Sequence, residues 1–153
     1  MREYLKNLRK QVGHMPVLVC AASVIVENAE GEILLQLRSD NKCWAYPGGG
    51  IDINEVVEDA AKRELLEETG LTANSLELFG VFSGKELYYI YPHGDEISNV
   101  DIVYICRNYS GEAKADLIEG DEVRFFPVNN LPENISPPCV PGIKKYKESR
   151  NAV

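Results

Sequence analysis

Three acidic residues stand close together in a stretch that the sequence predicts to be helical. This stretch is RELLEE, residues 63–68. At roughly 100° per residue, Glu64, Glu67 and Glu68 project within an arc of about 100° on one face of a helix. Like charges crowded in this way destabilise a helix unless a cation lies among them. Because carboxylate oxygens are the ligands that hard divalent metals prefer, the pattern predicts a metal site and, with it, phosphate chemistry.

A helical wheel separates this cluster from an ordinary solvated face. The core stripe of the helix is predicted to contain five apolar residues: Val56, Val57, Ala60, Ala61 and Leu65. Glu64 and Glu68 project along the same stripe, and Glu67 lies near its edge. A solvated acidic face would instead lie opposite the core. Carboxylates in such a position need partners, and the candidates are Arg63 or metal ions.

A glycine-rich segment, Pro47-Gly48-Gly49-Gly50, comes shortly before this helix. A backbone without side chains allows a ligand to approach closely and leaves a carbonyl oxygen available for coordination. We expect Asp52 or Asn54 to cap the helix at its start, and Gly70 to end it just after Glu68. By itself the glycine segment could be a flexible connector, but its fixed spacing to a helix lined with acids makes it more informative.

Apolar β-branched runs and turn residues predict the elements that position this helix. We expect a short basic helix over residues 2–10, a buried strand over 17–26 and its hairpin partner over 32–38. Further elements are expected as four strands and a final helix, over residues 78–82, 87–91, 100–107, 123–128 and 143–148. Because no repeat or long linker divides the chain, residues 1–153 are expected to form a single α/β domain with mixed or antiparallel strands.

Composition narrows the class of protein. An apolar content of 44% and a charged content of 26% are those of a globular protein. A net charge of −8 argues against nucleic acid or an anionic membrane as the main partner, but not against a small phosphorylated ligand. Neither a secretory signal nor a membrane-spanning run is recognised, so we expect a cytoplasmic protein. The four cysteines form no CxxC pair and are expected to be reduced: Cys20, Cys43, Cys106 and Cys139.

The residues around the acidic helix resemble the signature of the Nudix hydrolase superfamily, Gx5Ex7REUxEExGU, where U is a bulky aliphatic residue. All nine specified positions are satisfied, by Gly49, Glu55, Arg63, Glu64, Leu65, Glu67, Glu68, Gly70 and Leu71. Arg38 and Trp44, ahead of the glycines, also resemble bacterial members of MutT-like type. The resemblance implies an α/β/α sandwich with a mixed sheet and a central catalytic helix. The segment 52–54 departs from the Glu-Pro-Gly of many relatives, which implies a changed loop shape with the core acids intact.

The resemblance implies hydrolysis of the pyrophosphate bond in a nucleoside diphosphate linked to another moiety. In the family, Mg²⁺, and in some members Mn²⁺, is held by the acids of the second half of the motif. Here these would be Glu64, Glu67 and Glu68, aided by the carbonyl of Gly49. Arg63 would then orient the acids by ion pairing, with a catalytic role, and the glutamate at position 55 would hold the start of the helix.

Family members place the general base differently, and the sequence leaves it open. Glu64 resembles the base of some members. Glu119 and Glu122 resemble the acid on a later loop that serves in others. We prefer Glu119 because its loop is next to a glycine and is expected to be mobile.

The substrate is less well defined by the sequence. Arg38, Trp44 and Tyr88 are the candidate substrate-binding residues; Tyr88 resembles a tyrosine associated with dinucleoside polyphosphate hydrolases. The proline associated with ADP-sugar hydrolases is missing near Glu86, which argues mildly against ADP-ribose.

Three interpretations stay open. The favoured one is a pyrophosphohydrolase of nucleoside triphosphates or related nucleotides. The second is the same chemistry on a dinucleoside polyphosphate or a nucleotide-sugar. The third is a non-catalytic nucleotide-sensing module, against which the intact acids argue. Homodimers are common in the family, but no residue here demands one.

Overall fold

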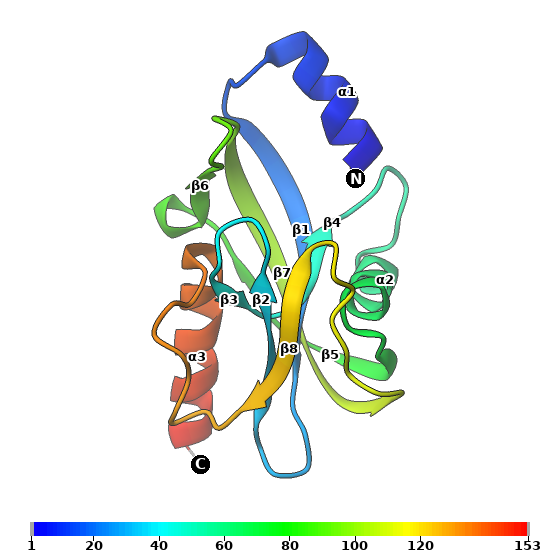
Figure 1. The fold of residues 1–153 in the computed structure, drawn as a ribbon, viewed down its shortest axis with the longest axis vertical. Helices are drawn as coiled ribbons and strands as arrows, with labels where there is room; N and C mark the ends of the chain where they lie inside the picture. Colours follow the sequence, from blue (N-terminus) through cyan, green and yellow to red (C-terminus); the bar gives the residue numbers. More distant parts are fainter. Residues whose placement is uncertain (1, 153) are drawn as a thin grey trace.

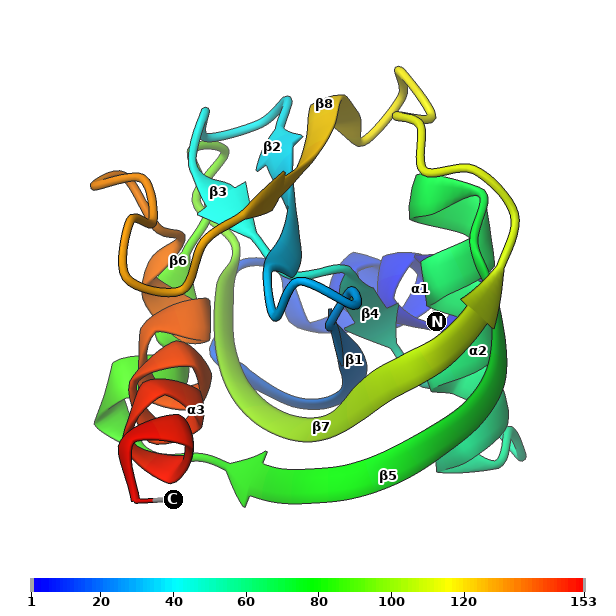
Figure 2. The same ribbon diagram turned by 90° about the horizontal axis from the view of Figure 1, so that it is seen from below.

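The computed structural model describes residues 2–152, in which two β-sheets lie between helices. Helix α2 (Val57–Thr69) covers one side of the sheets and helix α3 (Val140–Asn151) covers the other (Figures 1 and 2). Helix α1 (Arg2–Val12) lies at one end of the molecule, above the start of β1. This layering confirms the expected α/β/α architecture. No helix in the described part of the chain is long and apolar enough to cross a membrane.

The larger sheet has five strands in the order β4-β1-β7-β5, with β6 also paired to β7. Its strands are β1 (Val17–Val26), β4 (Gly48–Gly50), β5 (Thr72–Phe82), β6 (Tyr88–Ile90) and β7 (Glu96–Ser110). β1 and β7 run parallel, and the other pairs are antiparallel. The sheet is therefore mixed, as expected. The run VLVCAASVIV forms a central strand because its β-branched residues pack on both faces.

The smaller sheet corrects one prediction. It has three strands in the order β3-β2-β8: β3 (Trp44–Ala45), β2 (Ile33–Arg38) and β8 (Gly120–Phe126). Residues 32–38 were predicted to be the hairpin partner of 17–26, and this is wrong. The two strands share only one isolated bridge, between Glu27 and Ile33, and then diverge into different sheets. β2 pairs instead with β8, far along the chain, because its apolar residues then enter the core between the two sheets.

The apolar stripe of helix α2 packs against the larger sheet, and the helix ends at Gly70 as predicted. Ala60, Ala61 and Leu65 are fully buried against β1. Gly70 adopts the left-handed conformation (φ 75°), and its amide donates to the Leu66 carbonyl at 2.9 Å, which ends the helix. The start of the helix is different from the prediction. Val56 occupies the cap position without a side-chain hydrogen bond and is exposed, so it does not belong to the core stripe.

Neither residue predicted as the cap serves as one. Asp52 and Asn54 lie in the turn before the helix, and Asn54 has a positive φ of 65°. The Glu55 carboxylate accepts a hydrogen bond from the Asp52 amide at 2.8 Å. The turn therefore brings Glu55 back towards the glycine segment, in place of a cap.

The remaining elements lie where expected, but their bounds differ: β6 is shorter than the predicted 87–91, β8 begins and ends earlier than 123–128, and the others extend further. The strands predicted over 78–82 and 100–107 are parts of β5 and β7, whose outer ends contain alternating polar residues. A short 3₁₀ turn, Lys85–Leu87, precedes β6. Another, Pro137–Cys139, leads directly into α3, so the last helix begins before residue 143. Helix α1 ends at Val12, and its apolar residues pack against the start of β1 and of β7.

Candidate active site

Arg63 is the centre of the acidic cluster. Its guanidinium donates to both oxygens of Glu55, at 2.7 and 2.9 Å, and to Glu64 at 2.7 Å. It also reaches Glu67 at 3.4 Å and the Gly50 carbonyl at 3.1 Å. Hydrogen bonds from Arg63 lower the pKa of Glu55, and the acids in turn raise the pKa of Arg63. One cation therefore fixes acids from the turn and from the helix relative to the glycine segment.

The glycine segment lies directly against Glu64. A Cβ atom at Gly49 would lie 2.6 Å from the carboxyl carbon of Glu64, closer than side-chain carbons approach other atoms. At Gly48, a Cβ atom would lie 2.2 Å from the hydroxyl of Ser23 on β1. Only glycine lets this backbone pass between β1 and α2. The main chain of Gly49 consequently packs directly against the carboxylate of Glu64.

Glu68 is almost completely buried, with 2% of its surface exposed. Its carboxylate accepts hydrogen bonds from the Gly48 amide at 3.0 Å and from Nε2 of Gln36 on β2. Burial raises the pKa of Glu68 to about 8; the Gly48 amide opposes this, and the charge of Glu64 adds to it. Glu68 thus ties α2 to both the glycine segment and the smaller sheet. The helical wheel predicted that Glu64 and Glu68 point inward. Both are buried, so this prediction is confirmed.

These groups surround a cavity of about 440 Å³, here called the acidic cavity. Its lining includes five carboxylates and two guanidinium groups: Glu3, Asp52, Glu64, Glu67 and Glu119, with Arg38 and Arg63. Leu5 of α1 and Tyr91 also line it, together with Gly48, Gly49 and Gly50. So many acids would repel a phosphate in the absence of a cation.

The donor set fits a hard divalent cation, although no three acidic, histidine or cysteine side chains of residues 2–152 already surround a common point. The available donors are all oxygens, as Mg²⁺ and Mn²⁺ prefer. The Gly49 backbone passes close to Glu64. At present Arg63 holds Glu64, and Gly48 and Gln36 hold Glu68.

The structure brings some of the other predicted residues to this cavity and leaves others away from it. Arg38 lines it and is held by a two-point ion pair with Asp40, at 2.7 and 2.9 Å. Trp44 is buried in the core against Phe126 and lines no part of the cavity. Tyr88 is exposed, and its hydroxyl contacts the carboxylate of Glu96 on the neighbouring strand.

The two loop acids differ in the same way. Glu119 lines the acidic cavity. Its loop is hydrogen-bonded through Asp116, whose carboxylate accepts from the amides of residues 118, 119 and 120. Glu122 is paired with Arg124 on β8 and does not line the cavity.

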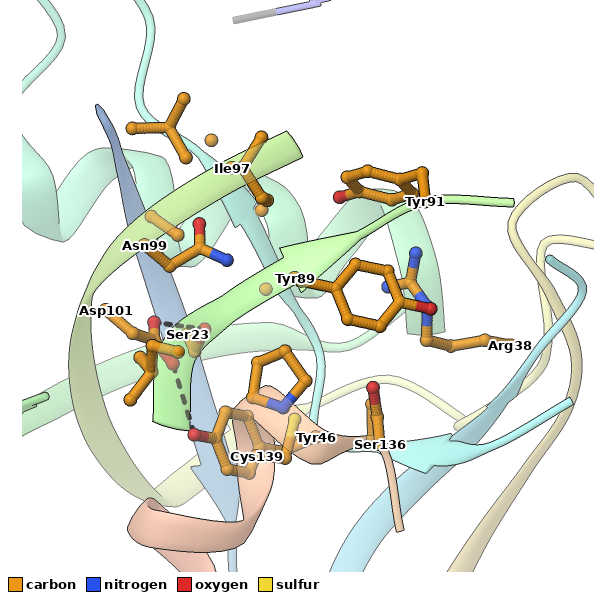
Figure 3. A pocket seen from close by; sticks show the side chains of 18 of the residues that line it. Ser23, Arg38, Tyr46, Tyr89, Tyr91, Ile97, Asn99, Asp101, Ser136 and Cys139 are labelled. Atoms are coloured by element: carbon orange, nitrogen blue, oxygen red, sulfur yellow. Dashed lines mark hydrogen bonds between the residues drawn. The ribbon is translucent and has the colours of Figure 1, made fainter. Parts of the chain in front are cut away.

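A second, smaller pocket of about 150 Å³ adjoins the acidic cavity and was missed by the sequence analysis (Figure 3). Its floor is a buried network in which Asp101 accepts hydrogen bonds from Ser23 at 2.7 Å and from the Tyr46 hydroxyl at 3.1 Å. Burial raises the pKa of Asp101 to about 6, although both hydrogen bonds lower it. A signal was present in the sequence: Asn99 and Asp101 are polar residues two positions apart, directly before the apolar run IVYIC, so in a strand both lie on one face.

The sequence model of the NUDIX domain family matches residues 18–144, which contain all but the first residue of β1, the glycine segment and α2. The chain belongs to the Nudix family. The predicted membership among MutT-like Nudix proteins is therefore confirmed. The acidic helix α2 is the Nudix helix of this chain.

The chain is similar in sequence to two curated Nudix proteins. An "ADP-ribose pyrophosphatase" of Methanocaldococcus jannaschii is 40% identical over 116 residues, 74% of this chain and 64% of the relative. An "RNA pyrophosphohydrolase" of Histophilus somni is 41% identical over 58 residues, 38% of this chain and 30% of the relative. The chain thus spans less than two thirds of the length of these Nudix relatives.

The structural comparison supports the fold. The crystal structure of a MutT NUDIX hydrolase from Burkholderia pseudomallei matches with a TM-score of 0.70 at 23% identity. The match covers 84% of this chain and 97% of that one. At this identity the likeness concerns the Nudix fold alone, and it confirms the mixed α/β class.

Proposed function

We propose that this chain, acting as a single domain, hydrolyses the pyrophosphate bond of a nucleoside diphosphate linked to another moiety. The observation that carries the proposal is the contact of the Gly49 backbone with the Glu64 carboxylate inside an acidic cavity. Acids crowded against a bare backbone suit a divalent cation and a phosphate ligand better than any uncharged ligand. Membership of the Nudix family supports the same reaction class.

The residues proposed to hold the metal are Glu64, Glu67 and Glu68, with the carbonyl of Gly49. Mg²⁺ is the proposed ion, and Mn²⁺ has the same ligand preference. When bound, the ion would screen the phosphate charges and stabilise the leaving phosphate. Glu64 and Glu67 line the acidic cavity, and Glu68 lies directly behind the glycine segment.

The other residues of the cavity are proposed to orient the acids, bind phosphate and accept a proton. Arg63 keeps the carboxylates in place, since it bridges four of them within 4 Å: Asp52, Glu55, Glu64 and Glu67. Arg38 provides a guanidinium at the cavity wall that can pair with a phosphate oxygen. Glu119 is the proposed general base because, unlike Glu122, it faces the cavity.

The favoured substrates are nucleoside triphosphates or related nucleotides. The second candidate is a nucleotide-sugar such as ADP-ribose, which the name of the 40% identical relative favours. The absence of a proline near Glu86 argues against it. A nucleotide-sensing module without catalysis is the alternative from another class.

The test is a panel of nucleoside triphosphates, dinucleoside polyphosphates and ADP-ribose, with Mg²⁺ or Mn²⁺ and chromatographic identification of the products. We expect a nucleoside monophosphate together with pyrophosphate or a phosphorylated second product. Preference between triphosphates and ADP-ribose decides between the two substrate classes. Tight binding without turnover across the panel would favour the sensing module and contradict the proposal.

A further inference from the structure

A buried glutamine outside the acidic motif contacts one of the acids proposed to hold the metal. Gln36 lies in the middle of β2 with 1% of its surface exposed. Its neighbours Leu35 and Leu37 belong to the apolar cluster that includes residues of α3, so the alternation of the strand directs Gln36 to the opposite side, towards α2. There its Nε2 donates a hydrogen bond to Oε2 of Glu68. The smaller sheet thus contacts an acid of α2 through this amide.

The two carboxylate oxygens of Glu68 have different surroundings. The Gly48 amide and Nε2 of Gln36 both donate to Oε2. No residue between positions 2 and 152 donates a hydrogen bond to the other oxygen, Oε1. Two donors from different strands hold the plane of the carboxylate in one orientation, as is usual for a carboxylate that ligates a metal. Oε1 is therefore the oxygen that Glu68 can offer to a cation.

Stability alone does not explain an amide at this position. Oε1 of Gln36 is buried and has no hydrogen-bonding partner within residues 2–152. A buried amide oxygen without a partner costs free energy. A methionine has nearly the same length and would fill the space without this cost. What Gln36 adds to the molecule is the donor that faces Glu68.

The space for this amide comes from Gly120 at the start of β8. A Cβ atom at Gly120 would lie 2.7 Å from Oε1 of Gln36, whereas the next nearest atom, the carbonyl oxygen of Leu37, would lie at 3.5 Å. The missing side chain therefore makes room for the Gln36 amide in particular. Gly120 directly follows Glu119, so the amide lies between α2 and the loop that carries the proposed base.

We propose that Gln36 is a positioning residue of the metal site, which holds Oε2 of Glu68 so that Oε1 faces the metal ion. The proposal rests on the proposed function, because that function assigns Glu68 as a metal ligand. Residues that hydrogen-bond to a ligating side chain typically contribute about 10- to 100-fold to metal affinity. Loss of the Gln36 amide should therefore weaken metal binding, but only while the Glu68 carboxylate is present to be oriented.

The test is a double-mutant cycle with Mn²⁺ alone, whose binding to the folded protein is measured by electron paramagnetic resonance. Gln36→Met removes the donor and is expected to raise the Kd for Mn²⁺ about tenfold. Glu68→Gln removes the carboxylate. In the Glu68→Gln background, Gln36→Met should change the Kd by less than about twofold, because the group through which it acts is gone. A mere packing defect at position 36 would raise the Kd by the same factor in both backgrounds.

Two further variants separate the amide from the packing of β2. Leu35→Met changes the adjacent buried residue, on the other face of the strand, and should keep the wild-type Kd. Gly120→Ala would displace the Gln36 amide without replacing it, so it should raise the Kd in the wild-type background and not in Glu68→Gln. This second variant decides the question even if Gln36→Met does not fold.

Additive effects of Gln36→Met and Glu68→Gln would overturn the positioning role. An unchanged Kd in both Gln36→Met and Gly120→Ala would overturn it too. If the wild type itself does not bind Mn²⁺, the proposed metal-dependent function fails as well, and the two failures are thus distinct.

Discussion

At the scale of single residues, the side chains of the acidic motif have different surroundings. Glu64 and Glu68 are buried, whereas Glu67 is half exposed and only loosely paired with Arg63. Glu67 thus contributes little to packing, and its carboxylate lines the acidic cavity. A substitution there should affect the reaction while leaving the fold intact.

Glu67→Gln is expected to reduce kcat by several powers of ten, because the proposed metal ion would lose a charged ligand. The melting temperature should remain close to that of the wild type. Glu58→Gln is the matched control, since Glu58 lies on the same helix and pairs with Lys62 away from the cavity. Steady-state kinetics and thermal unfolding measure the two effects. Equal activity of the two variants would remove Glu67 from the site.

The general base can be tested with the two loop acids. Glu119→Gln should lower kcat by about 10²- to 10⁴-fold, the usual contribution of a positioned base. Glu122→Gln should retain near wild-type activity because its carboxylate pairs with Arg124 outside the cavity. The pH profile of kcat should lose its acidic limb only in the first variant. A large loss in the second variant alone would reverse the assignment.

Asp101 predicts a pH dependence of stability. Its pKa is about 6 in the folded protein and 3.8 in the unfolded chain, so the folded state binds the proton more tightly. The contribution of Asp101 to the free energy of unfolding is fully present below pH 3.8 and is lost as the pH rises through about 6. This contribution is on the order of 3 kcal/mol. The nearest titratable groups do not interfere, because burial raises the pKa of Cys139 to about 12 and that of Tyr46 well above 10.

The free energy of unfolding of the wild type is therefore expected to fall between pH 5 and pH 8, and that of Asp101→Asn should fall less. Glu68, whose pKa is also raised, contributes in the same direction in both proteins and cancels in the comparison. Urea unfolding at the two pH values measures the difference. Identical pH dependence in the wild type and the variant would show that Asp101 is not protonated preferentially in the folded state.

At the scale of elements, the glycine segment and α2 act as one unit. Gly49→Ala should reduce the affinity for Mg²⁺ and the rate, because the added methyl group would displace the Glu64 carboxylate. Gly80→Ala is the control: this glycine lies on β5 without a positive φ, and its nearest neighbour is the movable end of Lys145. Metal titration monitored by calorimetry measures the affinity. Unchanged Mg²⁺ binding in Gly49→Ala would separate this backbone from the metal site.

The sequence predicted the elements whose evidence is local. The acids of α2 and its terminal glycine are within a few residues of one another, so a helical wheel was enough to predict their direction. The pairing of β2 was predicted wrongly because it depends on β8, more than eighty residues away. Gln36, Asn99 and Asp101 were missed for the same reason. The contacts of these three residues form only when strands far apart in the sequence pair with one another.

At the scale of the whole molecule, the acidic cavity lies where separate parts of the fold meet. α2 provides the acids, the larger sheet provides the glycine backbone, and the loop before β8 provides Glu119. Helix α1 closes one side through Leu5, which lines both the acidic cavity and the smaller pocket next to it. A net charge of −8 repels a phosphorylated substrate, and the proposed metal ion would offset that repulsion locally.

The most direct test of the central claim is a ³¹P NMR time course of a nucleoside triphosphate with the wild-type protein. The spectrum is followed with Mg²⁺, after addition of excess chelator, and after Mg²⁺ is restored. Nucleoside monophosphate and pyrophosphate are expected to appear with Mg²⁺, to stop accumulating on chelation and to accumulate again once Mg²⁺ is restored. Turnover at an undiminished rate in chelator, or release of inorganic phosphate alone, would contradict a metal-dependent pyrophosphohydrolase.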